Sequence, residues 1–193
     1  MGRSYTNITL KGPERDAIEV ALVNMKRQAV VTPTCDSLTV VFDAASEDQD
    51  GYVYDLASNL SRDLSCIALA VTNHDDSVLY FKVYDRGELI DTYNSCPSYF
   101  EDVEPLPPSG GNAELLCSLF ARPGNATNVE EILCFDALAD DADDRYVFES
   151  ERHIDLIDAL GLSRHAAGLG FEAVMAGELP EGLNLSDFRI LTT

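Results

Sequence analysis

Residues 66–95 constrain the fold of this chain more than any other stretch. Three runs rich in branched and aromatic residues follow one another there, and only short polar turns separate them. Such side chains pack well on a pleated surface, so the pattern predicts three consecutive strands. The second turn, Asp85-Arg86-Gly87, fits a three-residue hairpin loop whose glycine adopts the left-handed conformation. The sequence therefore predicts a β-meander at the centre of the fold.

The residues before the meander predict alternating strands and helices. Strands are expected at 4–10, 29–32 and 38–42, and helices at about 13–27 and 51–64. Pro13 suits the first helical position, and the acidic residues after it suit the positive end of the helix dipole. The resulting order, β-α-β-β-α-β, matches the ferredoxin-like arrangement, in which two helices cover one face of an antiparallel sheet. We therefore predict a ferredoxin-like α+β domain that the rest of the meander extends as a hairpin.

A proline- and glycine-rich stretch, residues 97–111, predicts a boundary between two units. Beyond it, helical patterns dominate, with helices expected at about 113–121, 127–138, 150–160 and 163–175, and with a final strand or turn at 183–191. The expected organisation is an α+β sheet domain at 1–96, a linker at 97–111, and a mainly helical unit at 112–193 that packs on the sheet domain.

The charge of the chain excludes some partners and favours others. With 34 acidic and 13 basic residues, the formal net charge is −21. Such a charge repels phosphate backbones and anionic lipid, so we expect no nucleic-acid partner. No apolar run is long enough to cross a bilayer, so we expect no membrane association either. The acidity instead favours a basic protein surface as the partner.

The cysteines indicate the compartment in which the protein works. There are five, at positions 35, 66, 96, 117 and 134, and no two form a Cys-x-x-Cys pair. The odd number and wide spacing predict free thiols rather than a disulfide framework. The N-terminus also lacks the apolar segment of a secretory signal. These features together predict a cytoplasmic protein.

No stretch of the sequence predicts a metal or a cofactor. The acidic cluster at 140–144 and the stretch 48–51 resemble calcium loops, but both lack required ligands and are expected to be solvated loops. The three histidines, His74, His153 and His165, are isolated from one another and from the cysteines. Phosphate-binding and dinucleotide-binding motifs are absent, so no cofactor is predicted.

Two groups of residues remain as candidate sites. Cys96 and Asn94 lie just after the last meander strand, a position where loops often carry function, although Cys96 has no basic neighbour in the sequence to activate it. No catalytic role is assigned to either. The partner-binding candidates are the tyrosines at one edge of the predicted sheet, because tyrosine rings are amphipathic and lose little entropy on binding, which suits a surface for a protein or a small ligand. They are Tyr80, Tyr84, Tyr93 and Tyr99.

Two functions remain open on these observations. One is a non-catalytic binding or regulatory protein that presents an acidic, tyrosine-rich surface to a basic protein partner. The alternative is a small enzyme with dispersed residues in a cleft near Cys96. A concave pocket with convergent polar groups beside Cys96 would favour the enzyme, and a tyrosine-rich surface would favour the binding protein.

Overall fold

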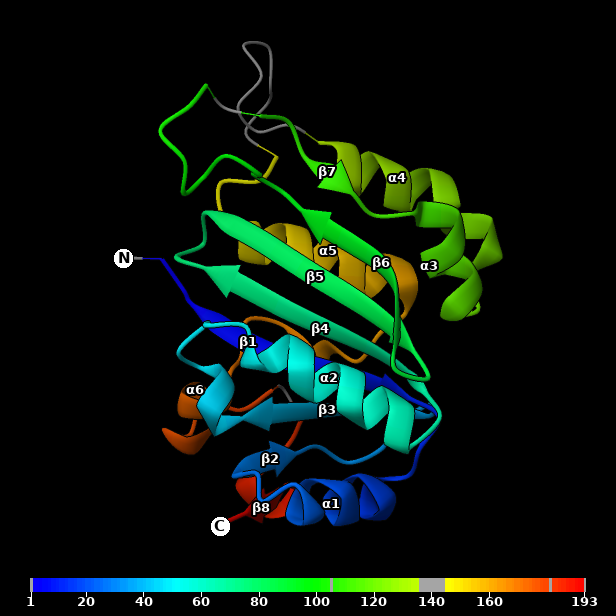
Figure 1. Ribbon diagram of the computed structural model, residues 1–193, viewed down its shortest axis with the longest axis vertical. Coiled ribbons are helices and arrows are strands. Elements are labelled where there is room, and N and C mark those ends of the chain that lie inside the picture. The colour runs from blue at the N-terminus through cyan, green and yellow to red at the C-terminus, as the bar shows by residue number, and fades with distance from the viewer. Residues whose placement is uncertain (1, 105, 136–144, 181, 193) are drawn as a thin grey trace.

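The computed structural model describes residues 2–104, 106–135, 145–180 and 182–192, and it has one antiparallel sheet of eight strands with six α-helices (Figure 1). The strand order is β7-β6-β5-β4-β1-β3-β2-β8. The strands are β1 (Tyr5–Lys11), β2 (Ala29–Val31), β3 (Leu38–Asp43), β4 (Ile67–His74), β5 (Val78–Asp85), β6 (Glu88–Asn94), β7 (Ser109–Gly110) and β8 (Arg189–Leu191). The predicted meander is confirmed as β4, β5 and β6.

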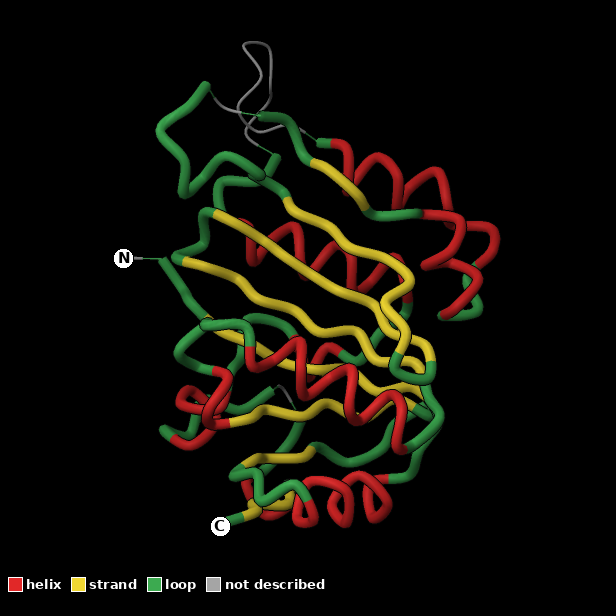
Figure 2. The backbone as a smooth tube through the Cα atoms, in the orientation of Figure 1, coloured by secondary structure: helices red, strands yellow, loops and turns green. Residues whose placement is uncertain are grey.

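Helices pack on both faces of this sheet (Figure 2). On one face, called the α2 face below, lie α1 (Arg15–Asn24) and α2 (Tyr52–Asp63). The opposite face, called the α5 face, packs against helices from the second half of the chain. These are α3 (Ala113–Leu119), α4 (Ala126–Cys134), α5 (Glu149–Leu160) and α6 (Phe171–Met175).

The alternation of side chains along each strand divides the hydrophobic core into two parts. In β5, Leu79, Phe81 and Val83 belong to the core on the α5 face, whereas Tyr84 belongs to the core on the α2 face. Successive side chains of a strand point to opposite faces, so this division follows from the sequence register. Among the helices that the structure describes, none lies in front of β6 or the outer part of β5, so the α2 face is only partly covered by them (Figure 1).

The sheet is larger than the ferredoxin-like arrangement that the sequence predicted. Strands β5, β6 and β7 extend it beyond β4, and β8 adds to the opposite edge by pairing with β2. This pairing satisfies backbone groups that β2 would otherwise expose as an edge strand, and it confirms the predicted final strand. Helices α1 and α2 lie on one face of the sheet, and helices from the second half of the chain pack on the other.

Three further predictions, for residues 163–175, 140–144 and 97–111, have different outcomes. The helix expected at 163–175 is interrupted: a short 3₁₀ turn at Arg164–Ala166 precedes α6, and Gly168 between them adopts a left-handed backbone with φ of 67°. The acidic cluster at 140–144 lies outside the described residues. The boundary at 97–111 stays a prediction, although the core on the α5 face contains side chains from both sides of it.

None of the helices in the described parts of the chain combines the length and the apolar character needed to cross a bilayer.

Candidate functional site

An aromatic pocket of about 430 Å³ opens at one end of the α2 face. Three segments of the chain supply its aromatic walls: Tyr54 comes from α2, Tyr80 from β5, and Phe100 from the loop after β6. The other lining residues described are Asp48, Gln49, Gly51, Thr72 and His74. We call this the aromatic pocket.

The register of the sheet explains why these side chains meet. Thr72 of β4 pairs with Tyr80 of β5, and Tyr80 pairs with Asn94 of β6, so the three side chains stand in a row on the α2 face. Tyr54 lies in the first turn of α2, and its hydroxyl donates to Thr72 Oγ1 over 3.0 Å. Thr72 and Tyr80 of this row therefore form the floor of the pocket, and Tyr54 of the helix above them forms one wall.

A cluster of three rings forms another wall. The centroid of the His74 ring lies 5.1 Å from that of Phe100 and 5.9 Å from that of Tyr99, both edge-on. Tyr99 and Phe100 also contact each other edge-on at 4.9 Å. Phe100 is 66% exposed, so its ring is supported on one side and open to a ligand or partner on the other.

The tyrosines of this region are held in their neutral form. Burial, with smaller contributions from the nearby phenols of Tyr80 and Tyr84, raises the pKa of Tyr54 to about 12, although the hydrogen bond with Thr72 lowers it. The pKa of Tyr80 is also raised, mainly by burial, although its hydrogen bond with Asn94 lowers it. Lys82 places its ammonium 4.5 Å from the centroid of the Tyr54 ring. The phenol rings thus present neutral, electron-rich faces, and one of them already binds a cation.

The structure brings together some of the predicted partner-binding tyrosines and separates others. Tyr80 lines the aromatic pocket, and Tyr99 contacts His74 beside it. Tyr84 is buried on the α2 face. Tyr93 is 3% exposed on the opposite face, where its ring stacks on Phe81 and its hydroxyl donates to the Leu133 carbonyl. Tyr93 therefore does not belong to the surface, because its position in β6 points it into the core.

Asn94 and Cys96 lie next to this region but build no nucleophile. The backbone N–H of Cys96 donates to Asn94 Oδ1, so the asparagine side chain shapes the turn that leaves β6. The Cys96 thiol makes no hydrogen bond with any residue that the structure describes. Cys96 is also not among the described residues that line the aromatic pocket.

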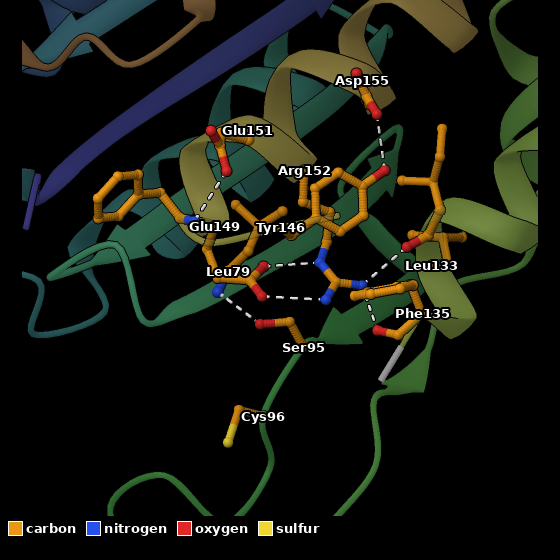
Figure 3. Close-up of polar contacts among 12 residues, drawn as sticks. Leu79, Ser95, Cys96, Leu133, Phe135, Tyr146, Glu149, Glu151, Arg152 and Asp155 are labelled. Carbon is orange, nitrogen blue, oxygen red and sulfur yellow. Dashed lines mark hydrogen bonds and ion pairs between the residues drawn. The ribbon is translucent and has the colours of Figure 1, made fainter. Parts of the chain in front are cut away.

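A buried charged cluster occupies the interface between the sheet and the helices of the α5 face (Figure 3). Arg152 of α5 is 1% exposed and forms a two-bonded ion pair with Glu149, at 2.8 and 3.1 Å. On its other side, Arg152 donates to the Ile132 and Phe135 carbonyls at the end of α4 and to the Tyr93 hydroxyl. All three guanidinium nitrogens donate, to acceptors in β6, at the end of α4 and in α5 itself, so the cluster joins the sheet, α4 and α5.

His153, next to Arg152, is also structural. Its side chain is 2% exposed, and burial lowers its pKa to about 4, so the ring is neutral at physiological pH. Its Nδ1 shares a 2.8 Å hydrogen bond with the hydroxyl of Tyr5 in β1. The imidazole therefore ties α5 to the centre of the sheet.

Glu47, in the turn before α2, makes the stability of the protein depend on pH. Its carboxylate accepts a 2.6 Å hydrogen bond from the backbone N–H of Phe171, yet burial, Glu172 and Asp43 raise its pKa from 4.5 to about 7. The folded state therefore holds this proton more tightly than the unfolded chain. The contribution of Glu47 to the free energy of unfolding should therefore be greatest below about pH 4.5 and should fall as pH rises to about 7.

We expect Glu47→Gln to remove most of this pH dependence, because the amide oxygen still accepts from Phe171 but cannot ionise. Between about pH 5 and pH 8, the wild type should lose up to about 2 kcal/mol relative to the variant, after allowance for partial exposure. Urea unfolding at both pH values measures the difference. The matched control is the exposed Glu101→Gln, which should follow the wild type. Parallel pH curves for wild type and Glu47→Gln would contradict this role.

Metal and redox chemistry find no support in the described ranges. No three His, Cys, Asp or Glu side chains within those ranges gather closely enough to hold a metal ion, and the five cysteines are free thiols. His74 is half-buried, and its ring contacts Phe100 and Gln49.

Sequence reasoning missed Tyr54 and Gln49 as pocket residues. Tyr54 falls on the edge of the apolar stripe of α2 and reads as a helix surface residue, and Gln49 lies in an acidic stretch that reads as a solvated loop. The available signal was the alternation in β4 and β5. It places Thr72, His74 and Tyr80 on the same face, and any helix over that face must contribute a residue beside them.

Comparison with known proteins gives no family or relative from which a function could be transferred: no protein-family model, no curated protein and no solved structure matches the chain.

Proposed function

We propose that this protein is a non-catalytic binding protein whose aromatic pocket takes a cationic side chain from a basic protein partner. The observation that carries the proposal is the convergence of Tyr54, Tyr80 and Phe100 on one pocket in a chain of net charge −21. Aromatic faces attract cations through their quadrupole, and such cages are used to recognise ammonium and guanidinium groups. The long-range field of the acidic chain would steer a basic partner toward the pocket.

The surroundings of the pocket favour the same partner. Asp48 lines it, and four exposed acidic residues flank the lining segments in the chain: Asp50, Glu101, Asp102 and Glu104. The loop that supplies Phe100 also exposes the apolar side chains of Val103 and Leu106. These acidic and apolar side chains on the segments that carry the lining residues would match a protein surface on which basic and apolar side chains alternate.

Lys82 is a nearby cation that opposes a cationic ligand. The ammonium of Lys82 lies over the Tyr54 ring. Lys82 itself is not among the described residues that line the pocket. Because Tyr54 already has a cation over its ring, we expect a ligand to bind mainly to the rings of Tyr80 and Phe100. Replacing Lys82 with methionine should strengthen binding of a basic peptide, because it removes a like charge and keeps a chain of similar length.

The test is the affinity of wild type and pocket variants for a labelled oligoarginine peptide at about 0.15 M salt, measured by fluorescence anisotropy. Tyr80→Leu and Phe100→Leu each remove a ring without changing the net charge. A lost cation–π contact is worth about 0.5–2 kcal/mol, so each should weaken binding by about 2- to 30-fold. The matched control is Tyr52→Leu, which removes an exposed tyrosine of α2 outside the pocket lining.

The net charge provides the rival explanation for any binding, and the control variant separates the two. If all three variants bind the peptide as tightly as the wild type, the attraction comes from the overall charge and the pocket is not the site. If Tyr52→Leu weakens binding as much as Tyr80→Leu does, any exposed aromatic ring contributes to binding, and the pocket is not a specific site. Circular dichroism of each variant checks that the fold is retained.

We also propose that the strands β4, β1, β3 and β2, with α1 and α2, form a ferredoxin-like unit inside the larger sheet. Their adjacent order and antiparallel pairing support this interpretation, as does the position of both helices on one face. The strands β5 and β6 would then be the addition that creates the aromatic pocket. A fold of this kind by itself implies no activity.

A further inference from the structure

We infer that the aromatic pocket selects the guanidinium group of arginine, and that His74 is the residue that determines this specificity. In this inference, which rests on the proposed function, Nε2 of His74 accepts an N–H of the ligand. Gln49 is a positioning residue that keeps Nε2 free to do so.

The hydrogen bonds of Gln49 define how its amide is oriented. Its Nε2 donates to the backbone carbonyl of Asn73 over 2.8 Å. Only the NH₂ group of an amide can donate to a carbonyl, so the amide oxygen must face the other way. That oxygen, Oε1, lies 2.7 Å from Nδ1 of His74. The backbone of Asn73 thus orients the amide that meets the histidine.

The orientation of Gln49 in turn selects the tautomer of His74. An amide oxygen can only accept, so Nδ1 of His74 must carry the hydrogen of this bond. In the neutral ring the other nitrogen, Nε2, then holds a lone pair and can only accept. Among the described residues, none donates to Nε2. Contacts with Phe100 and Tyr99 hold the ring at the pocket wall.

A neutral imidazole acceptor in an aromatic pocket distinguishes among cations. Aromatic rings alone attract any cation and suit quaternary ammonium groups well. An acceptor adds affinity only for a cation that has N–H groups, which a trimethylated lysine side chain lacks. Arginine combines a planar group that stacks on rings with several N–H donors, and Asp48 at the same pocket offers a carboxylate for this fork. The expected order of affinity is therefore arginine, lysine, trimethyl-lysine.

The first experiment compares oligoarginine, oligolysine and oligo-trimethyl-lysine peptides of equal length at about pH 8, where imidazoles are ordinarily neutral. The wild type should bind the arginine peptide roughly tenfold more tightly than the trimethyl-lysine peptide. His74→Phe keeps an aromatic ring but removes the acceptor, so the ratio of the two affinities should fall below about twofold. Because all three peptides are cationic, the ratio removes the contribution of net charge.

The second experiment tests the positioning role of Gln49 through the tautomer of His74, which a change in protein stability alone would not alter. ¹⁵N NMR distinguishes the protonated from the unprotonated nitrogen of the His74 ring. Wild type should show the Nδ1–H form, Gln49→Met should show a mixture of tautomers, and Gln49→Glu, which still accepts from Nδ1, should restore Nδ1–H. The preference for arginine should follow the same order. A predominant Nε2–H form in the wild type would overturn the inference.

The failure of this inference can be distinguished from failure of the proposed function. If Tyr80→Leu and Phe100→Leu leave the binding of every peptide unchanged, the pocket takes no cation and the proposed function is wrong. If those variants weaken binding but the trimethyl-lysine peptide binds the wild type as tightly as the arginine peptide does, the pocket binds cations without His74. In that case the proposed function stands and the arginine specificity is wrong.

Discussion

Replacing Arg152 with methionine is expected to lower the free energy of unfolding by about 3–5 kcal/mol, a large share of the 5–15 kcal/mol typical of a domain. The reason is the partner left behind. Glu149 is buried, and burial raises its pKa while Arg152 lowers it. Without the guanidinium, Glu149 must remain charged without its ion pair or take up a proton. Urea unfolding near neutral pH measures the loss.

The same substitution removes more than an ion pair. Arg152 also donates to the carbonyls of Ile132 and Phe135 at the end of α4, where a helix leaves its last carbonyls without partners. Its guanidinium lies 4.9 Å from the centroid of the Tyr146 ring. Loss of Arg152 should therefore loosen α4 and the start of α5 together, which hydrogen exchange would detect as reduced protection in both helices.

Two further variants separate the buried charge from loss of packing. Glu149→Gln added to Arg152→Met should recover part of the stability, because a neutral amide costs less to bury than a carboxylate. As an exposed control, Arg86→Ala removes a 3.8 Å ion pair with Asp85 at the surface and should change stability little. If the double variant is no more stable than Arg152→Met, the lost hydrogen bonds to α4 explain the whole effect.

Truncation of Phe81 to alanine is expected to have a comparable effect, about 3–5 kcal/mol. Phe81 is 1% exposed in the core on the α5 face, where its ring stacks on Tyr93 with centroids 5.1 Å apart. The substitution removes a buried ring and leaves a cavity that the surrounding strands and helices fill only in part. The urea midpoint should fall sharply.

The neighbouring residue provides the control for Phe81. Tyr80 is half-buried on the α2 face, so Tyr80→Ala should shift the urea midpoint much less than Phe81→Ala does. If the two substitutions proved equally damaging, the α2 face at β5 would be as well covered as the α5 face. The aromatic pocket would then be part of the core, and the proposed binding of a cationic side chain would lose its basis.

Local patterns made much of the sheet predictable. The runs of branched and aromatic residues at β4, β5 and β6 and the turn at Asp85-Arg86-Gly87 specify the meander without help from distant residues. The alternation in β5 also predicts that Phe81 and Tyr80 lie on opposite faces of the sheet. Such features depend on neighbours in the chain, and so they can be read from the sequence.

The candidate site was predictable only in part. Tyr80 and Tyr99 could be proposed because they follow one another along a short stretch of the meander and its loop. Tyr93 was placed wrongly in this group, since a register count in β6 was needed to see that it faces the core. Gln49 and Tyr54 reach the pocket from α2 and the turn before it, and nothing near them in sequence indicates what they meet.

The sequence by itself determined the order of strands and helices as far as β6, the net acidity of the chain and the alternation of faces along β5, because these depend on residue type and local spacing. The tertiary structure decided which helices cover which face, where β8 pairs, and which rings meet His74. These features depend on contacts between residues far apart in the chain, such as Glu47 with Phe171 and Arg152 with Tyr93. Such contacts form because burial of apolar area over the whole chain outweighs the loss of chain entropy, and no local pattern specifies that balance.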